Sequence, residues 1–365
     1  MVGRQIAQSK RSSEDGPEDL PQSLSEAHSV AWAWHALRAE HPGGDEIELL
    51  LTAAEKDVQH AMSLDPNQAD AWRALGTMQW LRNQPTEALA SLDRALTLRP
   101  DAEETWELKG DILEQENRDS EALEAYRRWI ALLPVTDETK GDSRCLALDK
   151  HAAVCRKLGR WSDAAADLRS GGIPARDPAT DARLVDLSAF YTIIGTSPLE
   201  KVYTGIRTCD GTRFDARGCL LLAFGKYFSF LFPDHMLGIP VALKGHRIHL
   251  LHGAMRGLDA PADKADAPGT PIGKYVLRFA DGTALEKPIV LARDVLDIHA
   301  EPPVPGDGNA RLGCDINYPN DALDHPVHLY ITTWDNPHPE TEILSLDFIS
   351  FRQAEAPFLV AVTIE

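Results

Sequence analysis

Residues 69–134 repeat one pattern of aromatic, small and proline residues at a spacing of 34 residues. Trp72 recurs as Trp106, Gly76 as Gly110, Ala88 as Ala122, Leu92 as Tyr126 and Pro100 as Pro134. A period of this length is typical of a helix-turn-helix unit that stacks on copies of itself. Small residues allow the two helices of a unit to approach closely, and the apolar residues need a neighbouring unit to cover them. The pattern therefore predicts consecutive antiparallel helix pairs.

The prolines agree with this interpretation, because Pro100 and Pro134 stand where the second helix of each pair must stop. The residue types and the period resemble the tetratricopeptide repeat. This resemblance implies an α-helical solenoid in which the first helix of each pair lines a concave surface that binds other polypeptides. It also implies that the chain acts through binding.

Flanking segments extend the helical region to residues 23–169. Ala54 and Val58 stand one period before Ala88 and Leu92, so the helix predicted over residues 45–66 is the second helix of a degenerate first repeat with a lengthened turn. Periodic apolar residues also predict a helix over residues 25–41 and a final pair over residues 142–169, after an insertion of about eight residues. Residues 1–22 are rich in Ser, Glu, Asp and Pro, so we expect a disordered tail.

The second half of the chain changes to the pattern of β-strands. Residues 170–184 contain glycine and proline without periodicity and are predicted to be a linker. Beyond them, Asp281-Gly282 lies between two alternating segments, which predicts a hairpin. Strands are expected over residues 213–224, 241–251, 274–280, 327–334, 342–350 and 358–364. An estimate of seven to nine strands over residues 185–365 predicts an antiparallel β-sandwich, and the fold class as a whole is α+β with several domains.

The segments TTWDNPHPETEILSLDFIS, APFLVAVTIE, GTRFDARG and IGKYVLRFADG resemble the jelly-roll modules related to galactose-binding domains. Such modules accompany many bacterial glycosidases and regulatory multidomain proteins. The resemblance implies a strand at Asp347, Phe348 and Ile349 and a turn at Trp334, Asn336 and Pro337. It supports the expected fold more than any activity.

The concave surface provides the candidate binding residues. Positions two, five, nine and twelve of the two clear first helices carry Asp70, Arg73, Thr77, Trp80, Glu104, Glu107, Asp111 and Glu114. Family members that capture a terminal carboxylate use Lys, Arg and Asn at such positions, and this chain departs from that pattern. We hypothesise that a basic or amphipathic segment binds here, with Trp80 as an apolar anchor and Glu107 and Asp111 as charge partners. The alternative is a solvated acidic helix face.

Composition limits the possible partners. The formal net charge of −19 disfavours binding to nucleic acid, and no apolar run approaches the roughly 20 residues that a membrane span needs. The first residues lack the apolar core of a secretory signal, so we expect a cytoplasmic protein. The five cysteines form no C-x-x-C pair and are interpreted as reduced thiols, with neither a metal site nor a cofactor.

Catalytic motifs are missing from the sequence, which contains no G-x-S-x-G, H-E-x-x-H or G-x-G-x-x-G motif. His246, His249 and His252 are too far apart along a strand to bind one ion together. The preferred interpretation is a non-catalytic adaptor that binds a protein through its repeats and a further subunit, or its own repeats, through the β-sandwich. The alternatives are a carbohydrate-binding module and a hydrolase. Sugar-stacking candidates are Tyr203, Tyr318, Tyr330 and Trp334.

Overall fold

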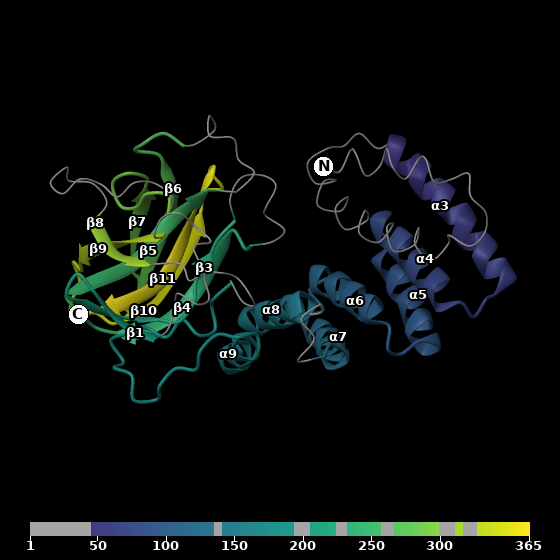
Figure 1. Ribbon diagram of the computed structural model, residues 1–365, viewed down its shortest axis with the longest axis horizontal. Coiled ribbons are helices and arrows are strands. Elements are labelled where there is room, and N and C mark those ends of the chain that lie inside the picture. Colours follow the sequence, from purple (N-terminus) through teal and green to yellow (C-terminus); the bar gives the residue numbers. More distant parts are fainter. Residues whose placement is uncertain are drawn as a thin grey trace. The chain divides into compact units, whose positions relative to one another are not determined.

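The computed structural model describes residues 45–134, 141–192, 205–223, 232–256, 266–298, 311–316 and 327–365 (Figure 1). Contacts divide the chain into two compact units, Met1–Leu133 and Pro134–Glu365. The predicted tail over residues 1–22 and the predicted helix over residues 25–41 lie outside the described residues. So does most of the predicted insertion, at residues 135–140.

The described part of the first unit consists of helices. They are α3 (Asp45–Leu64), α4 (Ala69–Leu81), α5 (Pro85–Leu98), α6 (Glu103–Gln115) and α7 (Asp119–Leu132). Helices α4 and α5 form one antiparallel pair and α6 and α7 form the next, so the prediction for residues 69–134 is confirmed. The turn within each pair has an asparagine with positive φ at an equivalent position, Asn83 at 60° and Asn117 at 57°. Asparagine adopts this left-handed conformation more readily than most residues.

The repeated tryptophans and glycines have repeated structural roles. The indole N–H of Trp72 donates to the Pro66 carbonyl at 2.9 Å, and that of Trp106 donates to the Pro100 carbonyl at 2.8 Å. Each tryptophan thus holds the chain where it enters the pair. A Cβ at Gly110 would lie 2.4 Å from the ring of Tyr126, so only glycine allows α6 and α7 to approach this closely.

The second unit begins with a further helix pair, α8 (Gly141–Lys157) and α9 (Trp161–Ser170), as the sequence predicts. Gly159 forms the turn with a φ of 69°. The pair contacts the segment that follows it: Arg156 Nη1 donates to the Ala189 carbonyl at 3.4 Å, and the rings of Trp161 and Phe190 are 5.0 Å apart. The contact division therefore groups this pair with the strands, whereas the sequence suggests a boundary at residues 170–184, which stays a prediction.

A buried ionic network holds residues of the predicted linker against the strands. Arg217 donates to Asp215 Oδ1 at 2.9 Å and to the Pro174 carbonyl at 3.0 Å. The side chains of Arg217 and Asp215 are only 3% and 2% exposed, and Arg176 pairs with Asp215 at 3.0 Å. Buried charges need such partners, because an unpaired charge would carry the full cost of its lost hydration.

The strands form three antiparallel sheets. The five-stranded sheet has the order β3 (Leu220–Leu221), β11 (Glu355–Ile364), β5 (Arg247–Arg256), β9 (Val327–Asp335) and β8 (Arg311–Ile316). The four-stranded sheet has the order β4 (His235–Leu243), β10 (Ile343–Ser350), β6 (Pro271–Phe279) and β7 (Ala284–Val290). β1 (Gly205–Cys209) and β2 (Thr212–Ala216) form a two-stranded sheet.

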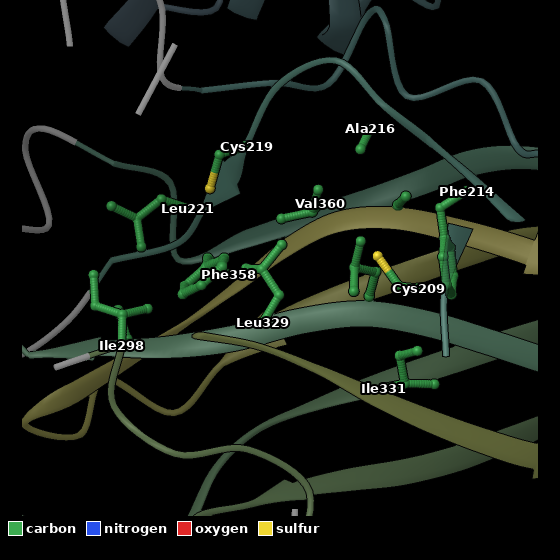
Figure 2. Packing of buried hydrophobic residues seen from close by; sticks show 13 residues of the cluster. Cys209, Phe214, Ala216, Cys219, Leu221, Ile298, Leu329, Ile331, Phe358 and Val360 are labelled. Atoms are coloured by element: carbon green, nitrogen blue, oxygen red, sulfur yellow. The ribbon is translucent and has the colours of Figure 1, made fainter. Parts of the chain in front are cut away.

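Aromatic side chains join the two larger sheets. Tyr275 of β6 stacks on Phe348 of its own sheet at 4.8 Å and meets Trp334 of β9 edge-on at 5.5 Å. Its hydroxyl lies 3.1 Å from Nδ1 of His252 on β5. A second apolar cluster gathers Phe214, Leu329 and Phe358 with other buried residues from β1, β2, β3, β5, β9 and β11 (Figure 2). All ten residues of β11 are buried, and its central residues 356–362 are all apolar.

The Asp281-Gly282 hairpin is confirmed. It joins β6 to β7, with Gly282 at a φ of 85°, and Asp281 Oδ1 accepts a hydrogen bond from the Thr283 amide at 2.9 Å.

Three local predictions for the strand region, by contrast, are wrong. Residues 241–251 are not one strand, because β4 ends at Leu243 and a tight turn packs Gly245 against the carbonyl of Glu365. Residues 213–224 are also interrupted, where Gly218 packs on the ring of Tyr191. Trp334 belongs to β9 rather than to a turn.

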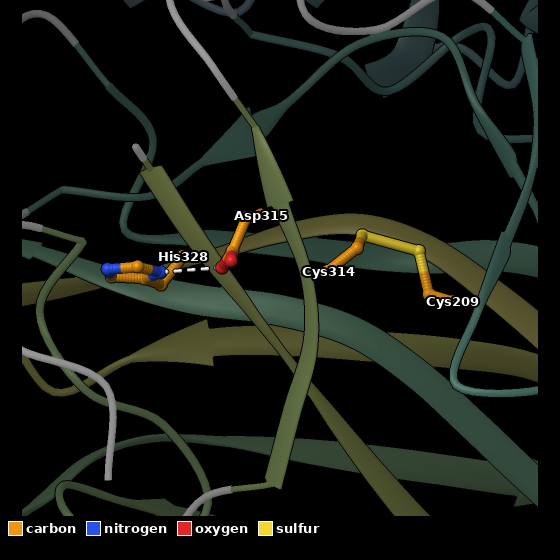
Figure 3. Close-up of a disulfide and its surroundings, with 4 residues drawn as sticks. All are labelled: Cys209, Cys314, Asp315 and His328. Atoms are coloured by element: carbon orange, nitrogen blue, oxygen red, sulfur yellow. Dashed lines mark hydrogen bonds and ion pairs between the residues drawn. A yellow bond between two sulfur atoms is a disulfide. The ribbon is translucent and has the colours of Figure 1, made fainter. Parts of the chain in front are cut away.

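The cysteine prediction is corrected as well. Cys209 of β1 and Cys314 of β8 form a disulfide across 105 residues of sequence (Figure 3). Nothing in the spacing of the cysteines indicates this pair, because the fold alone brings the two strands together. Disulfides persist mainly in oxidising compartments, so this bond lends no support to the cytoplasmic location, which stays a prediction. None of the described helices is both long and apolar enough to cross a bilayer.

Candidate functional site

The predicted binding residues lie on the first helices of the two clear repeats, α4 and α6. Four of them are buried: Arg73, Thr77 and Trp80 are each 6% exposed, and Asp111 is 8% exposed. Glu104 is exposed, and Asp70, Glu107 and Glu114 are partly buried. The structure therefore separates an accessible acidic set on α6 from a buried set beneath it.

Trp80 links the two helices. Its indole N–H donates to Oε1 of Gln115 on α6 at 3.3 Å, and the residue is only 6% exposed. An exposed apolar anchor would offer its ring face to a partner, whereas Trp80 is a buried residue of the stack. Periodicity alone could not show this, because burial depends on contacts with residues distant in the sequence.

Tyr126 of α7 positions two acidic side chains of α6. Its hydroxyl lies 2.8 Å from Asp111 Oδ1 and 2.8 Å from Glu114 Oε2. Burial, and then the two carboxylates, raise the pKa of Tyr126 far above its ordinary value, so the phenol stays neutral and donates. One hydroxyl proton serves one carboxylate at a time. The sequence offers a signal for this role, since Tyr126 replaces Leu92 of the preceding repeat.

The charges of α4 and α6 differ. On α4, Asp70 forms ion pairs with Arg99 and, at 3.7 Å, with Arg73. Helix α6 contains five acidic residues and one lysine. That lysine, Lys109, pairs with Asp93 of α5 at 2.5 Å and lies over the ring of Trp106. The accessible α6 carboxylates Glu104, Glu107 and Glu114, which we call the acidic face, therefore form the strongest charged feature at the predicted site.

Of the four aromatic residues considered for sugar binding, the two that the structure describes pack inside the β-region. Tyr330 is fully buried, and Trp334 is partly buried against Tyr275. Tyr203 and Tyr318 lie outside the described residues.

The histidines of the β5 region have separate partners. His249 bonds to Thr333 Oγ1 at 2.9 Å and His252 bonds to Thr332 Oγ1 at 2.8 Å. Burial lowers the pKa of His252 to about 4, so this side chain is a neutral core residue.

One buried carboxyl group, that of Glu355, has a pKa in the neutral range. Burial, and then the neighbouring Asp266 and Asp297, raise the pKa of Glu355 to about 7. Perturbed carboxyls occur at catalytic sites but also in structural networks. Here Glu355 Oε2 accepts the Asp266 amide at 2.9 Å, and Asp297 Oδ2 accepts the Arg256 amide at 2.7 Å. These hydrogen bonds hold the backbone at Asp266 and Arg256, so the role of Glu355 and Asp297 is structural.

Comparison with known proteins identifies the repeats. The tetratricopeptide repeat profile matches residues 47–103 and 82–135, so this region consists of tetratricopeptide repeats. No curated protein sequence matches the chain.

Similar solved structures include pilF of Pseudomonas aeruginosa, at 17% identity and a TM-score of 0.29 over 42% of this chain and 64% of that one, less than two thirds of its length. The type III secretion translocator chaperone SycD of Yersinia enterocolitica is 15% identical, with a TM-score of 0.29 over 41% of this chain and 92% of that one. MamA is 16% identical, with a TM-score of 0.29 over 42% and 90%. Scores this low carry no argument about function.

Proposed function

We propose that this protein is a non-catalytic adaptor whose tetratricopeptide repeats bind a basic or amphipathic segment of another polypeptide. Proteins with such repeats generally bind protein partners, and the acidic face gives this surface its character. The observation that carries the proposal is the accumulation of carboxylates on α6, with its one lysine directed to α5. Complementary charge speeds the encounter of two partners and selects against like-charged competitors.

The residues of the site have different roles in this proposal. Glu104, Glu107 and Glu114 contact the cationic side chains of the partner. Tyr126 positions Asp111 and Glu114, because its hydroxyl can donate to either carboxylate. The buried Arg73, Thr77 and Trp80 form the support below the surface. Partly exposed ion pairs are screened by salt, so the association rate should fall as ionic strength rises.

For the second unit we propose a β-sandwich of jelly-roll type that binds a further subunit. The contacts of Tyr275 with Trp334 and His252, which join the five-stranded and four-stranded sheets, support this interpretation. The resemblance of its sequence segments to galactose-binding-like modules supports it too. A regulatory role in a bacterial complex is consistent with both.

The test compares two double charge reversals in the full-length protein. Glu104→Lys with Glu107→Lys alters the acidic face. Glu87→Lys with Glu121→Lys makes the same change in net charge at equivalent exposed positions of α5 and α7. Tagged proteins are expressed in the native host, and captured proteins are quantified by mass spectrometry.

We expect the first variant to lose at least about tenfold of a captured partner that the second variant retains, because two like-charge contacts cost about 1.4 kcal/mol or more together. Circular dichroism confirms that both variants are folded. Equal capture by wild type and both variants would contradict the proposal.

A further inference from the structure

The α8–α9 hairpin brings together three side chains that bind metals in other proteins. His151 and Cys155 stand four residues apart on one face of α8, and Asp167 faces them from α9. His151 Nδ1 lies 2.7 Å from Asp167 Oδ2 and 3.7 Å from Cys155 Sγ. The three ligand atoms all lie within 4.8 Å of one another.

The cluster is shielded from solvent but has an open side. Cys155 is fully buried, whereas the side chains of His151 and Asp167 are 13% and 17% exposed. Burial favours a site that holds its ligands in fixed positions. The remaining exposure provides a path by which an ion and a water molecule can enter.

The hydrogen bonds of the cluster are incomplete without a cation. Both the carboxylate and the sulfur face the same nitrogen, Nδ1 of His151, which carries at most one hydrogen. One hydrogen on Nδ1 therefore serves one neighbour at a time, whereas a metal ion among the three atoms would contact all of them.

The distances fit a tetrahedral ion. Bonds of about 2.0–2.1 Å to nitrogen and oxygen and about 2.3 Å to sulfur place the ligand atoms of a tetrahedral zinc ion about 3.4–3.6 Å from one another. The sulfur lies 3.7 Å from the nitrogen, within about 0.1 Å of this range. The carboxylate is closer than that and needs to move by roughly 0.7 Å, which a side-chain rotation of Asp167 can supply.

We propose that His151, Cys155 and Asp167 bind Zn²⁺ or a closely similar divalent transition metal, with water as the fourth ligand. Thiolate and imidazole select this class of ion over Mg²⁺ and Ca²⁺, which prefer oxygen ligands. The ion joins α8 to α9 and so stabilises the hairpin that packs on Phe190 and Ala189. This site is separate from the acidic face and does not depend on the proposed binding of a polypeptide.

The first experiment measures metal binding directly. Full-length protein is stripped with a chelator under mild reduction, dialysed against Zn²⁺ and analysed for bound metal. Co²⁺ is titrated into a second sample and followed by absorption. We expect one tightly bound Zn²⁺ per chain, and with Co²⁺ the near-ultraviolet charge-transfer band of a thiolate ligand. Absence of that band in the wild-type protein would overturn the proposal whether or not any variant folds.

The second experiment assigns the ligands. Cys155→Ser and Asp167→Asn should each weaken Zn²⁺ binding by at least tenfold, because each removes one of three protein ligands. Cys145→Ser, which alters another cysteine of the same helix, should bind like the wild type. Circular dichroism establishes that each variant is folded. Unchanged affinity in Cys155→Ser, or equal loss in Cys145→Ser, would contradict the assignment.

Discussion

Substitution of Gly110 by alanine should destabilise the second tetratricopeptide pair, although alanine is the better helix former. The new Cβ would lie 2.4 Å from Cε1 and 2.6 Å from Cδ1 of Tyr126, whereas carbon atoms normally approach to about 3.5–4.0 Å. The ring would have to move by about 1 Å. It is fully buried, and its hydroxyl is held by Asp111 and Glu114.

Two opposing terms set the size of this effect. Overpacking of a filled core costs about 1–3 kcal/mol, and the hydrogen bonds to the two carboxylates resist any shift of the ring. The gain in helix propensity from glycine to alanine offsets up to about 1 kcal/mol. We expect a net loss of about 2 kcal/mol in the free energy of unfolding. Gly76→Ala should cost less, because the nearest atom there is the flexible end of Leu92 at 2.9 Å.

Urea unfolding of the full-length protein provides the assay. Tryptophan fluorescence reports mainly on the helices, since five of the six tryptophans among the described residues lie in helices, and far-ultraviolet circular dichroism gives an independent signal. In the double variant Gly110→Ala with Tyr126→Leu, the smaller side chain should relieve the overlap. The loss of unfolding free energy in the double variant should therefore be smaller than the sum of the losses in the two single variants. A neutral or stabilising Gly110→Ala would refute the reasoning, because that is the behaviour of a helix glycine with free space around it.

Three further predictions concern the second unit. The pKa of Glu355 in the folded protein, about 7, is above its ordinary value of 4.5, so this carboxyl contributes stability that is complete at low pH and is lost as the pH rises through 7. Glu355→Gln should therefore flatten the fall in urea midpoint between pH 5 and pH 8, an effect of at most about 3 kcal/mol. An unchanged dependence of the midpoint on pH would contradict this prediction. Reduction of the Cys209–Cys314 disulfide should lower the unfolding free energy of this unit by about 2–4 kcal/mol, since the bond closes a loop of 105 residues, and equal thermal midpoints with and without reductant would argue against the bond. Arg217→Met should lower the free energy of unfolding by about 3–5 kcal/mol, because it deprives the buried Asp215 of a partner. Amide hydrogen exchange should then accelerate in residues 174–188, which the network contacts at Pro174. Unchanged exchange would show that the network does not hold this segment.

The sequence predicts the repeats because their signal is local and periodic. Trp72 and Trp106, and Gly76 and Gly110, recur at one spacing, and each pair also has one repeated structural role. The hairpin at Gly282 is predictable for a similar reason, since its positive φ depends on the chain within the turn. Such features require no knowledge of distant contacts.

Features that depend on distant residues are not predictable in this way. The hydrogen bond of Trp80 depends on Gln115 of the next repeat, and the Cys209–Cys314 bond depends on how β1 meets β8. The cluster of His151, Cys155 and Asp167 likewise forms only when α9 folds back on α8. The acidic residues of α6 are visible in the sequence, but their division into accessible and buried side chains is a property of the stack.

The central claim is that the acidic face of α6 contacts the partner polypeptide, and site-specific photocrosslinking tests it most directly. A photoreactive amino acid is placed at Glu107 in one full-length protein and at Glu121 of α7 in another, and both are irradiated in the native host. The proposal predicts one abundant crosslinked protein at Glu107, with a basic segment at the attachment point, and little of that product at Glu121. A product that forms at Glu121 and not at Glu107, or an attachment point in an acidic segment, would contradict it.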